Sequence, residues 1–264
     1  MKHFKYWSNE DYLIQIDGQQ RKIRLLTGSN ISTENAREES IRKAQQIEKR
    51  IAQRDSFDEY EVGIKEYVSE FLDESNVVTV CRYGARILNT NEYTILDLDD
   101  YPRRFFDRFK PLDGMTKKEK IIHRFEESVS RFSKLGADFR IYETANGIRV
   151  IGKNYLDPEK TSSIKLMKKI NVDWLYMTLS RKQRCYRARL TPKPYRMGIK
   201  TIRVRSPLVC ETDEYNEWSK MYETASRDYC VVRLVKSIGR DFSRDPVIRF
   251  HDEQCNAHKS AKLA

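Results

Sequence analysis

The sequence has no long apolar run, no closely spaced pair of cysteines and no glycine-rich phosphate loop. Its apolar stretches fall far short of the ~18 residues that a membrane-spanning helix needs, and residues 1–12 lack the apolar region of a signal peptide. The five cysteines include no CxxC pair, which argues against a disulfide framework and a zinc ribbon. Neither GxxxxGK nor GxGxxG occurs. These absences predict a reduced, cytoplasmic protein that does not enter a membrane.

The composition is polar, yet it is that of a globular protein. Charged residues make up 34% of the 264 residues, but 15 Tyr, 11 Phe and 3 Trp are too many aromatic residues for a disordered chain. The length is sufficient for one large domain or two small domains with a substantial buried core.

Acidic residues are absent from one long stretch of the chain. Between Trp174 and Cys210 there is no Asp or Glu, although the stretch holds ten Lys and Arg residues. Removing those ten charges from the formal net charge of +11 leaves +1, so the rest of the chain is almost neutral. A basic excess that is confined to one stretch favours an anionic partner over a general solubility role.

The pattern within this stretch predicts a β-hairpin. Residues 185–190 and 202–205 alternate basic and apolar side chains, as half-buried strands do, and residues 191–198 contain two prolines and a glycine. Such a hairpin would place four arginines on one sheet face without acidic partners, and guanidinium groups suit phosphate oxygens. The predicted phosphate-binding residues of the hairpin are Arg187, Arg189, Lys193, Arg196, Arg203 and Arg205.

Hydrophobic periodicity predicts an α+β fold with a mixed or antiparallel sheet core and flanking helices. Strands are expected within 4–27 and at 77–81, 85–88, 93–99, 139–142 and 148–152, and helices at 33–53, 57–73, 117–135, 158–170 and 211–242. Asn146-Gly147 predicts a hairpin between the last two strands, and Ser32-Thr33 predicts the N-cap of the first helix. We expect one compact domain over 1–264. Residues 1–75 would give N-terminal strands and a helical extension, 76–210 the core, and 211–264 a helical segment with a polar tail.

A pair of aspartates on one predicted strand is the second informative feature. Asp97 and Asp99 alternate with Leu96 and Leu98, so both carboxylates should project from the same side of the strand. Neighbouring carboxylates repel each other unless a cation lies between them, and their oxygens suit Mg²⁺ or Mn²⁺. The sequence therefore predicts Asp97 and Asp99 as metal ligands and catalytic residues.

The order of these motifs resembles the archaeo-eukaryotic primase family, the primase-polymerase core with an RRM-like sheet. The similarity covers residues 93–206: LDLD at 96–99 resembles the DxD strand, and TANGIRV at 144–150 resembles the Ser/Thr-x-x-Gly-x-His strand. MTLS at 177–180, continuing to RARLTP at 187–192, resembles the third acidic strand and its arginine-rich continuation. The resemblance implies that Arg149 contacts a nucleotide triphosphate or a template backbone.

The chain departs from the family pattern at two positions. Arg149 stands where the family has its nucleotide-binding histidine, and arginine cannot act as an acid or base. Ser180 stands where a third carboxylate is expected, with Asp173 as a candidate replacement metal ligand. The RARLTPKPYR segment, residues 187–196, also resembles a segment of small uncharacterised bacterial proteins that have no known activity.

Three functions are compatible with these motifs. The first is a divergent primase-polymerase-like protein that binds nucleic acid or a nucleotide triphosphate with Mg²⁺ or Mn²⁺, as a metal-dependent nucleotidyltransferase. The second is a non-catalytic DNA- or RNA-binding module on a degenerate scaffold, whose binding would be metal-independent and steeply salt-dependent. The third is a metal-dependent nuclease that uses Asp97, Asp99 and Glu143. The oligomeric state does not follow from the sequence.

Two further groups of residues give only weak indications of a functional site. His251, Cys255 and His258 have a spacing that could suit zinc, but a polar tail is the simpler interpretation. Cys185 lies among basic residues that would lower its pKa, although no histidine is close to it in sequence.

Overall fold

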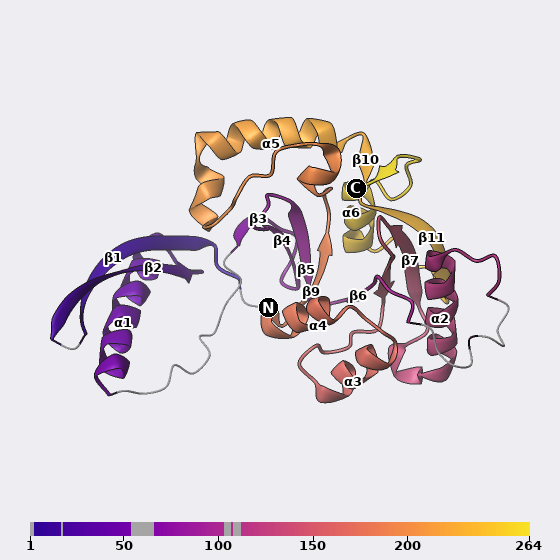
Figure 1. Cartoon of the computed structure of the whole chain (residues 1–264), viewed down its shortest axis with the longest axis horizontal. Coiled ribbons are helices and arrows are strands. Elements are labelled where there is room, and N and C mark those ends of the chain that lie inside the picture. The colour runs from indigo at the N-terminus through magenta and orange to yellow at the C-terminus, as the bar shows by residue number, and fades with distance from the viewer. Residues whose placement is uncertain (1–2, 17, 54–65, 103–106, 108–111) are drawn as a thin grey trace.

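Two four-stranded antiparallel sheets form the centre of the molecule (Figure 1). The computed structural model describes residues 3–16, 18–53, 66–102, 107 and 112–264. The first sheet has the order β3-β4-β5-β9, and the second has the order β11-β7-β8-β6. The strands of the first sheet are β3 (Tyr67–Phe71), β4 (Asn76–Val80), β5 (Arg86–Thr90) and β9 (Tyr186–Arg189).

The second sheet carries the predicted acidic strand at its edge. Its strands are β6 (Thr94–Leu98), β7 (Phe139–Thr144), β8 (Ile148–Gly152) and β11 (Val232–Ile238). β6 pairs with β8, and β7 pairs with β8 on one side and with β11 on the other. The turn at Asn146-Gly147 joins β7 to β8, as the sequence predicts.

One hydrophobic core joins the two sheets. It contains Val78 and Leu88 from the first sheet, Ile141 and Val150 from the second, and Ile248 from near the C-terminus, all 1% exposed or less. Because the strands of both sheets contribute to the same apolar interior, residues 76–210 and the C-terminal segment fold around a shared core.

Five helices are interspersed with the core strands along the chain. They are α2 (Lys117–Arg131), α3 (Thr161–Lys169), α4 (Trp174–Gln183), α5 (Asp213–Ser226) and α6 (Pro246–Gln254). α2 starts with a capping box in which the Thr116 and Glu119 side chains accept from each other's backbone N–H groups. Phe125 of α2 packs edge-to-face on Phe139 with ring centroids 5.2 Å apart, which places α2 against the second sheet.

The N-terminal unit is a long hairpin that packs on a helix. β1 (Tyr6–Ile16) pairs with β2 (Gln19–Ser29), and α1 (Thr33–Ala52) begins at the predicted N-cap Ser32. Ile14 is buried between the hairpin and α1. In Figure 1 these elements lie at the left, beside the two central sheets. The N-terminal extension is therefore as much strand as helix.

The prediction of a helix at 57–73 is wrong for the last part of that segment. Residues Tyr67–Phe71 form β3 and pair with β4, although their aromatic spacing also fits a helix. Pairing with β4 determines the conformation of this segment, because intrinsic propensity and residue spacing are weak signals of secondary structure in a short run. The first part of the predicted helix falls within 54–65, which lies outside the described residues.

The predicted basic hairpin does not form. β9 pairs with β5 instead of with residues 202–205, which belong to no strand. Pro194–Met197 form a 3₁₀ turn, and the chain then leaves the sheet. The segment corresponding to the third acidic strand of the primase-like pattern, residues 177–180, lies in α4.

The C-terminal part contains more sheet and more buried structure than the sequence predicts. α5 ends at Ser226, and β10 (Tyr229–Cys230) and β11 follow within the segment predicted as one helix. β10 pairs in parallel with β12 (Lys262–Leu263). The expected polar tail contains α6, whose Ile248 and His251 are fully buried. Over the described residues, no helix has the length and hydropathy of a membrane span.

Candidate functional site

The acidic pair lies where β6 ends beside β8. Asp97 is half-buried and stands opposite Arg149 in the antiparallel register, whereas Asp99 follows the last residue of the strand and is exposed. Leu96 and Leu98 point into the core, as the alternation predicts. The two carboxylates are near enough for the charge of Asp97 to raise the pKa of Asp99.

Gly147 leaves the room that Asp99 occupies. A Cβ atom at this position would lie 2.2 Å from the Leu98 carbonyl oxygen and 2.7 Å from both Cα and Oδ1 of Asp99. The glycine of the TANGIRV segment is therefore required by the close approach of the β7–β8 turn to the end of β6. This contact connects two sequence motifs that are about 50 residues apart.

Four charged groups act on the carboxyl of Asp99. Although the Asp99 residue is exposed, its carboxyl is partly desolvated at the end of β6, which raises its pKa, and the carboxylates of Asp97 and Asp173 raise it further. The ammonium groups of Lys117 and Lys193 lower it. The site therefore combines three carboxylates, which favour a bound cation, with two ammonium groups, which favour an anion next to that cation.

Asp173 reaches this site because β6 and α4 are bonded to each other. Its backbone N–H donates to the Asp97 carbonyl oxygen at 3.0 Å, and its carboxylate caps α4 by accepting from the Tyr176 N–H at 2.6 Å. The sequence predicted Asp173 as a replacement for the missing carboxylate at Ser180, and the fold brings Asp173 to the acidic pair. Among the described residues, however, no three His, Cys, Asp or Glu side chains are arranged to hold a metal ion on their own.

Arg149 lies inside the protein, where it holds Asp97. Its side chain is only 3% exposed, and its Nε atom is 3.3 Å from Oδ1 of Asp97. Its Nη1 atom donates to the Arg189 carbonyl at 3.0 Å and lies 3.3 Å from Nε2 of His251. Burial opposes the charge of Arg149, but Asp97 helps to raise its pKa. The triphosphate contact expected of Arg149 is therefore not open in this structure.

His251 and Asp252 extend these contacts into α6. The Nε2 atom of His251 lies 3.3 Å from Nη1 of Arg149, and the Nδ1–H of His251 donates to Asp252 at 2.9 Å. Burial lowers the pKa of His251, but its contacts with Cys255 and Asp252 raise it to about 9. Asp252 also accepts from the Tyr142 hydroxyl at 2.8 Å and from Arg140 at 2.6 Å. These hydrogen bonds and charges lower the pKa of Asp252 although burial raises it.

We call the connected side chains the Arg149 network, which comprises Asp97, Arg149, His251, Asp252, Arg140 and Tyr142. The sequence predicted no role for His251 or Asp252 in this site. The signal available was the helical spacing of Val247, Ile248 and His251, which are all buried on one face of α6.

Arginines of the predicted phosphate-binding face form contacts within the protein. Arg187 forms an ion pair with Glu66 at 2.6 Å, and both side chains are 13% exposed. Arg189 donates to the Thr191 and Ala264 carbonyl oxygens, and burial lowers its pKa. The prediction that these arginines lack acidic partners is wrong for Arg187. Arg203 and Arg205 are exposed but lie outside the sheet.

The 3₁₀ turn after β9 brings basic side chains to the acidic site. Lys193 acts on Asp99, and Tyr195, 62% exposed, lies 5.9 Å from the cationic groups of both Lys193 and Arg196. Burial raises the pKa of Tyr195, but the charges and hydrogen bonds of Lys193 and Arg196 together lower it below its ordinary value. Lys193 is thus the residue of the predicted phosphate-binding set that the structure connects most directly to Asp99.

The other candidate groups do not form sites in the described structure. Burial raises the pKa of Cys185 to about 11, so the expected thiolate is disfavoured. Glu143 is paired with Lys118 at 2.7 Å and Arg233 at 3.2 Å, and β8 lies between its strand and β6. This arrangement does not support the nuclease carboxylate set.

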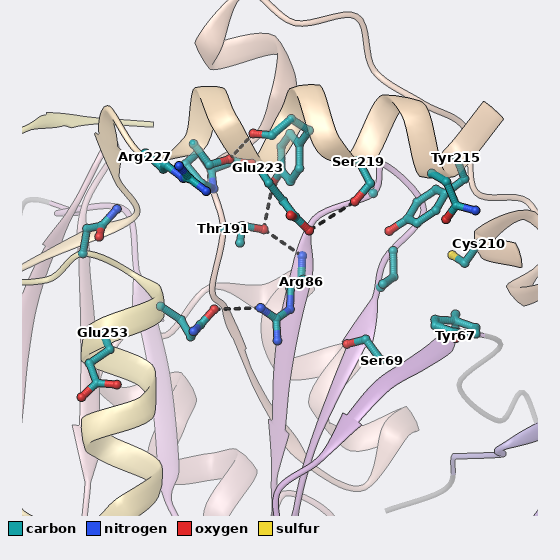
Figure 2. A pocket seen from close by; sticks show the side chains of 18 residues that line it. Tyr67, Ser69, Arg86, Thr191, Cys210, Tyr215, Ser219, Glu223, Arg227 and Glu253 are labelled. Carbon is teal, nitrogen blue, oxygen red and sulfur yellow. Dashed lines mark hydrogen bonds between the residues drawn. The ribbon is translucent and has the colours of Figure 1, made fainter. Parts of the chain in front are cut away.

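A separate cavity of about 710 Å³ lies between α5 and the first sheet (Figure 2). Arg86 extends into it and binds Gln254 at 2.8 Å and Glu70 at 2.8 Å, while Glu223 and Tyr222 approach from α5. None of the predicted site residues lines this cavity. The acidic site and the cavity are therefore different features of the surface.

The Arg187–Glu66 ion pair generates a stability prediction. Arg187→Ala would leave the Glu66 carboxylate buried without its cation, and we expect the free energy of unfolding to fall by about 3–5 kcal/mol. The exposed Arg203→Ala should change it by less than about 0.5 kcal/mol. Urea unfolding followed by circular dichroism measures both. Unchanged stability of the Arg187 variant would show that the ion pair contributes nothing to the fold.

The close approach at Gly147 generates a second prediction. Gly147→Ala must displace backbone atoms at the end of β6, and we expect a loss of about 1–3 kcal/mol in the free energy of unfolding. Asn146→Ala, in the same turn but exposed, is the matched control and should stay within about 0.5 kcal/mol. Equal stability of the two variants would mean that the turn does not pack against Asp99 as described.

No protein-family model, curated protein or solved structure matches this chain. The geometry of the acidic site is therefore the main indication of what the protein binds.

Proposed function

We propose that this protein binds a nucleotide triphosphate or a nucleic-acid phosphate through a divalent cation held at Asp99 and Asp97. The supporting observation is that the Asp173 N–H bonds to the Asp97 carbonyl at 3.0 Å beside Asp99, and that Lys117 and Lys193 are close enough to lower the pKa of Asp99. A cation would relieve the repulsion among the carboxylates, and the lysines would attract the anion that the cation binds.

The carboxylates suit Mg²⁺ or Mn²⁺ in chemistry and number. Within the described contacts, Arg149 uses only Oδ1 of Asp97, and the N-cap bond uses only Oδ1 of Asp173. Mg²⁺ is commonly held by one or two carboxylates together with substrate phosphates and water, so a protein cage of three ligands is not needed. When bound, the cation would neutralise phosphate charge.

The residues of the chain then have distinct roles. Asp99 would bind the cation, Asp97 would be its second ligand, and Arg149 would keep Asp97 oriented from the interior. Lys117 and Lys193 would contact phosphate oxygens at the border of the site. Tyr195 is exposed beside Lys193 and could stack on a base.

Catalysis by primase-like nucleotidyl transfer is the stronger form of this proposal, and a metal-independent binding module is the alternative. Exposed Arg203 and Arg205 support the alternative, because they offer charge away from the acidic site. Incubation with labelled single-stranded DNA or RNA, Mn²⁺ and nucleotide triphosphates separates the activities. Extension indicates a polymerase, shortening indicates a nuclease, and a shifted intact band indicates a binding protein.

The proposal predicts opposite effects of Asp99→Asn on stability and on metal binding. The raised pKa means that ionisation of Asp99 destabilises the fold as pH rises through that pKa, so the neutral amide should be more stable at pH 7. A change of about 0.5 kcal/mol, normal for exposed charges, corresponds to a melting temperature about 1–2 °C higher. The stabilisation that Mn²⁺ gives the unmodified protein should be lost.

Asp100→Asn is the matched control, since Asp100 is the next residue and is also exposed. It should keep the Mn²⁺-dependent increase in melting temperature. An equal Mn²⁺ response of the unmodified protein and the Asp99 variant, measured by differential scanning calorimetry, would remove Asp99 from the proposed site.

A further inference from the structure

One side of α4 exposes a row of apolar side chains that no described element covers. Trp174 is 68% exposed, Leu175 56% and Leu179 40%. Their spacing of one, four and five positions places them along one side of the helix, over little more than one turn. We call this row the α4 ridge. Contiguous exposed apolar groups of this kind are unusual on a soluble surface and mark interaction sites.

The opposite side of α4 is firmly held. Met177 and Ser180 are buried, and the Tyr176 hydroxyl donates to the Ile95 carbonyl at 2.8 Å. The same hydroxyl accepts from the Arg187 N–H at 3.2 Å. Because Tyr176 fixes α4 to both central sheets, the helix cannot rotate to bury the ridge without breaking these bonds.

Charge around the ridge selects the kind of partner. Arg181 and Lys182 are exposed at the C-terminal end of α4, one to two turns from the apolar residues. The chain carries no acidic residue from Trp174 to Cys210. Asp173 caps the N-terminal end of α4, so the positive charge lies at the C-terminal end of the ridge, and a partner with apolar side chains and carboxylates facing that end is favoured.

We propose that the α4 ridge docks an acidic amphipathic helix of a partner protein. An amphipathic helix presents apolar residues at three- and four-residue spacing, which matches the ridge, and its glutamates or aspartates would face Arg181 and Lys182. Trp174 is the expected centre of the contact, because tryptophan is enriched among residues that dominate binding energy. Single-stranded nucleic acid is less favoured: Leu175 and Leu179 have no ring on which a base can stack.

A fluorescein-labelled peptide tests this inference. The probe is a 16-residue helical peptide with leucines at three- and four-residue spacing and glutamates elsewhere, and a scrambled peptide of the same composition is its control. Fluorescence anisotropy should give saturable binding to the unmodified protein. Leu175→Ser combined with Leu179→Ser should weaken it at least tenfold, which is about 1.4 kcal/mol.

Two controls keep the test specific to the ridge. Met221→Ser changes an exposed apolar residue of α5, 52% exposed, and should leave peptide binding unchanged. The fluorescence of Trp174, obtained by subtracting the signal of a Trp174→Phe variant, should shift to shorter wavelength when the peptide binds, because the indole loses water. Circular dichroism should show that all variants remain folded.

Several results would overturn the inference. These are equal binding of the scrambled peptide, unchanged binding by the double variant, or no saturable binding below about 1 mM. If the double variant instead loses binding of labelled oligo(dT) and keeps binding of the peptide, that result would assign the ridge to nucleic acid. A concentration-dependent dimer that the double variant abolishes, measured by light scattering, would assign it to a second copy of this chain.

Discussion

The contacts of the buried Arg149 side chain determine how the rest of the candidate site is arranged. Arg149 donates to Asp97 on β6 and to the Arg189 carbonyl on β9, and it lies 3.3 Å from His251 on α6, so it joins both central sheets and the C-terminal helix. A buried guanidinium group needs acceptors for its hydrogens, because burial without them is strongly unfavourable. The same contacts that satisfy Arg149 therefore fix the position of Asp97 at the protein surface.

Charge balance in this network leaves Asp99 in a distinct position. Arg149 and Arg140 pair with Asp97 and Asp252, and His251 lies between Arg149 and Asp252. Within the described part of the chain, Asp99 forms no salt bridge and experiences the repulsion of its acidic neighbours. Buried, satisfied polar networks rigidify their surroundings, and here the rigid part supports an exposed carboxylate that has no ion-pair partner among the described residues. This contrast is the physical basis for the proposed function.

Local patterns in the sequence predicted the parts of the structure that depend on local chemistry. Alternation gave β6 and β8 and placed the Asp97 and Asp99 side chains together, and the Asn146-Gly147 turn was identified correctly. The partners of buried charges could not be predicted in this way, because they come from distant positions. Glu66 is 121 residues from Arg187, and His251 is 102 residues from Arg149. The basic stretch consequently resembled a ligand-binding face, although Arg187 and Arg189 are largely used within the fold.

The central claim is that the acidic site binds a cation and a phosphate ligand together. The most direct test is a titration of the unmodified protein with Mn²⁺, followed by electron paramagnetic resonance, in the presence and absence of a non-hydrolysable nucleoside triphosphate. Because binding free energies are reciprocal, each ligand should increase the affinity of the protein for the other, and we predict at least a tenfold effect after correction for Mn²⁺ bound to free nucleotide. Nucleotide affinity that is the same with and without Mn²⁺ would contradict the account.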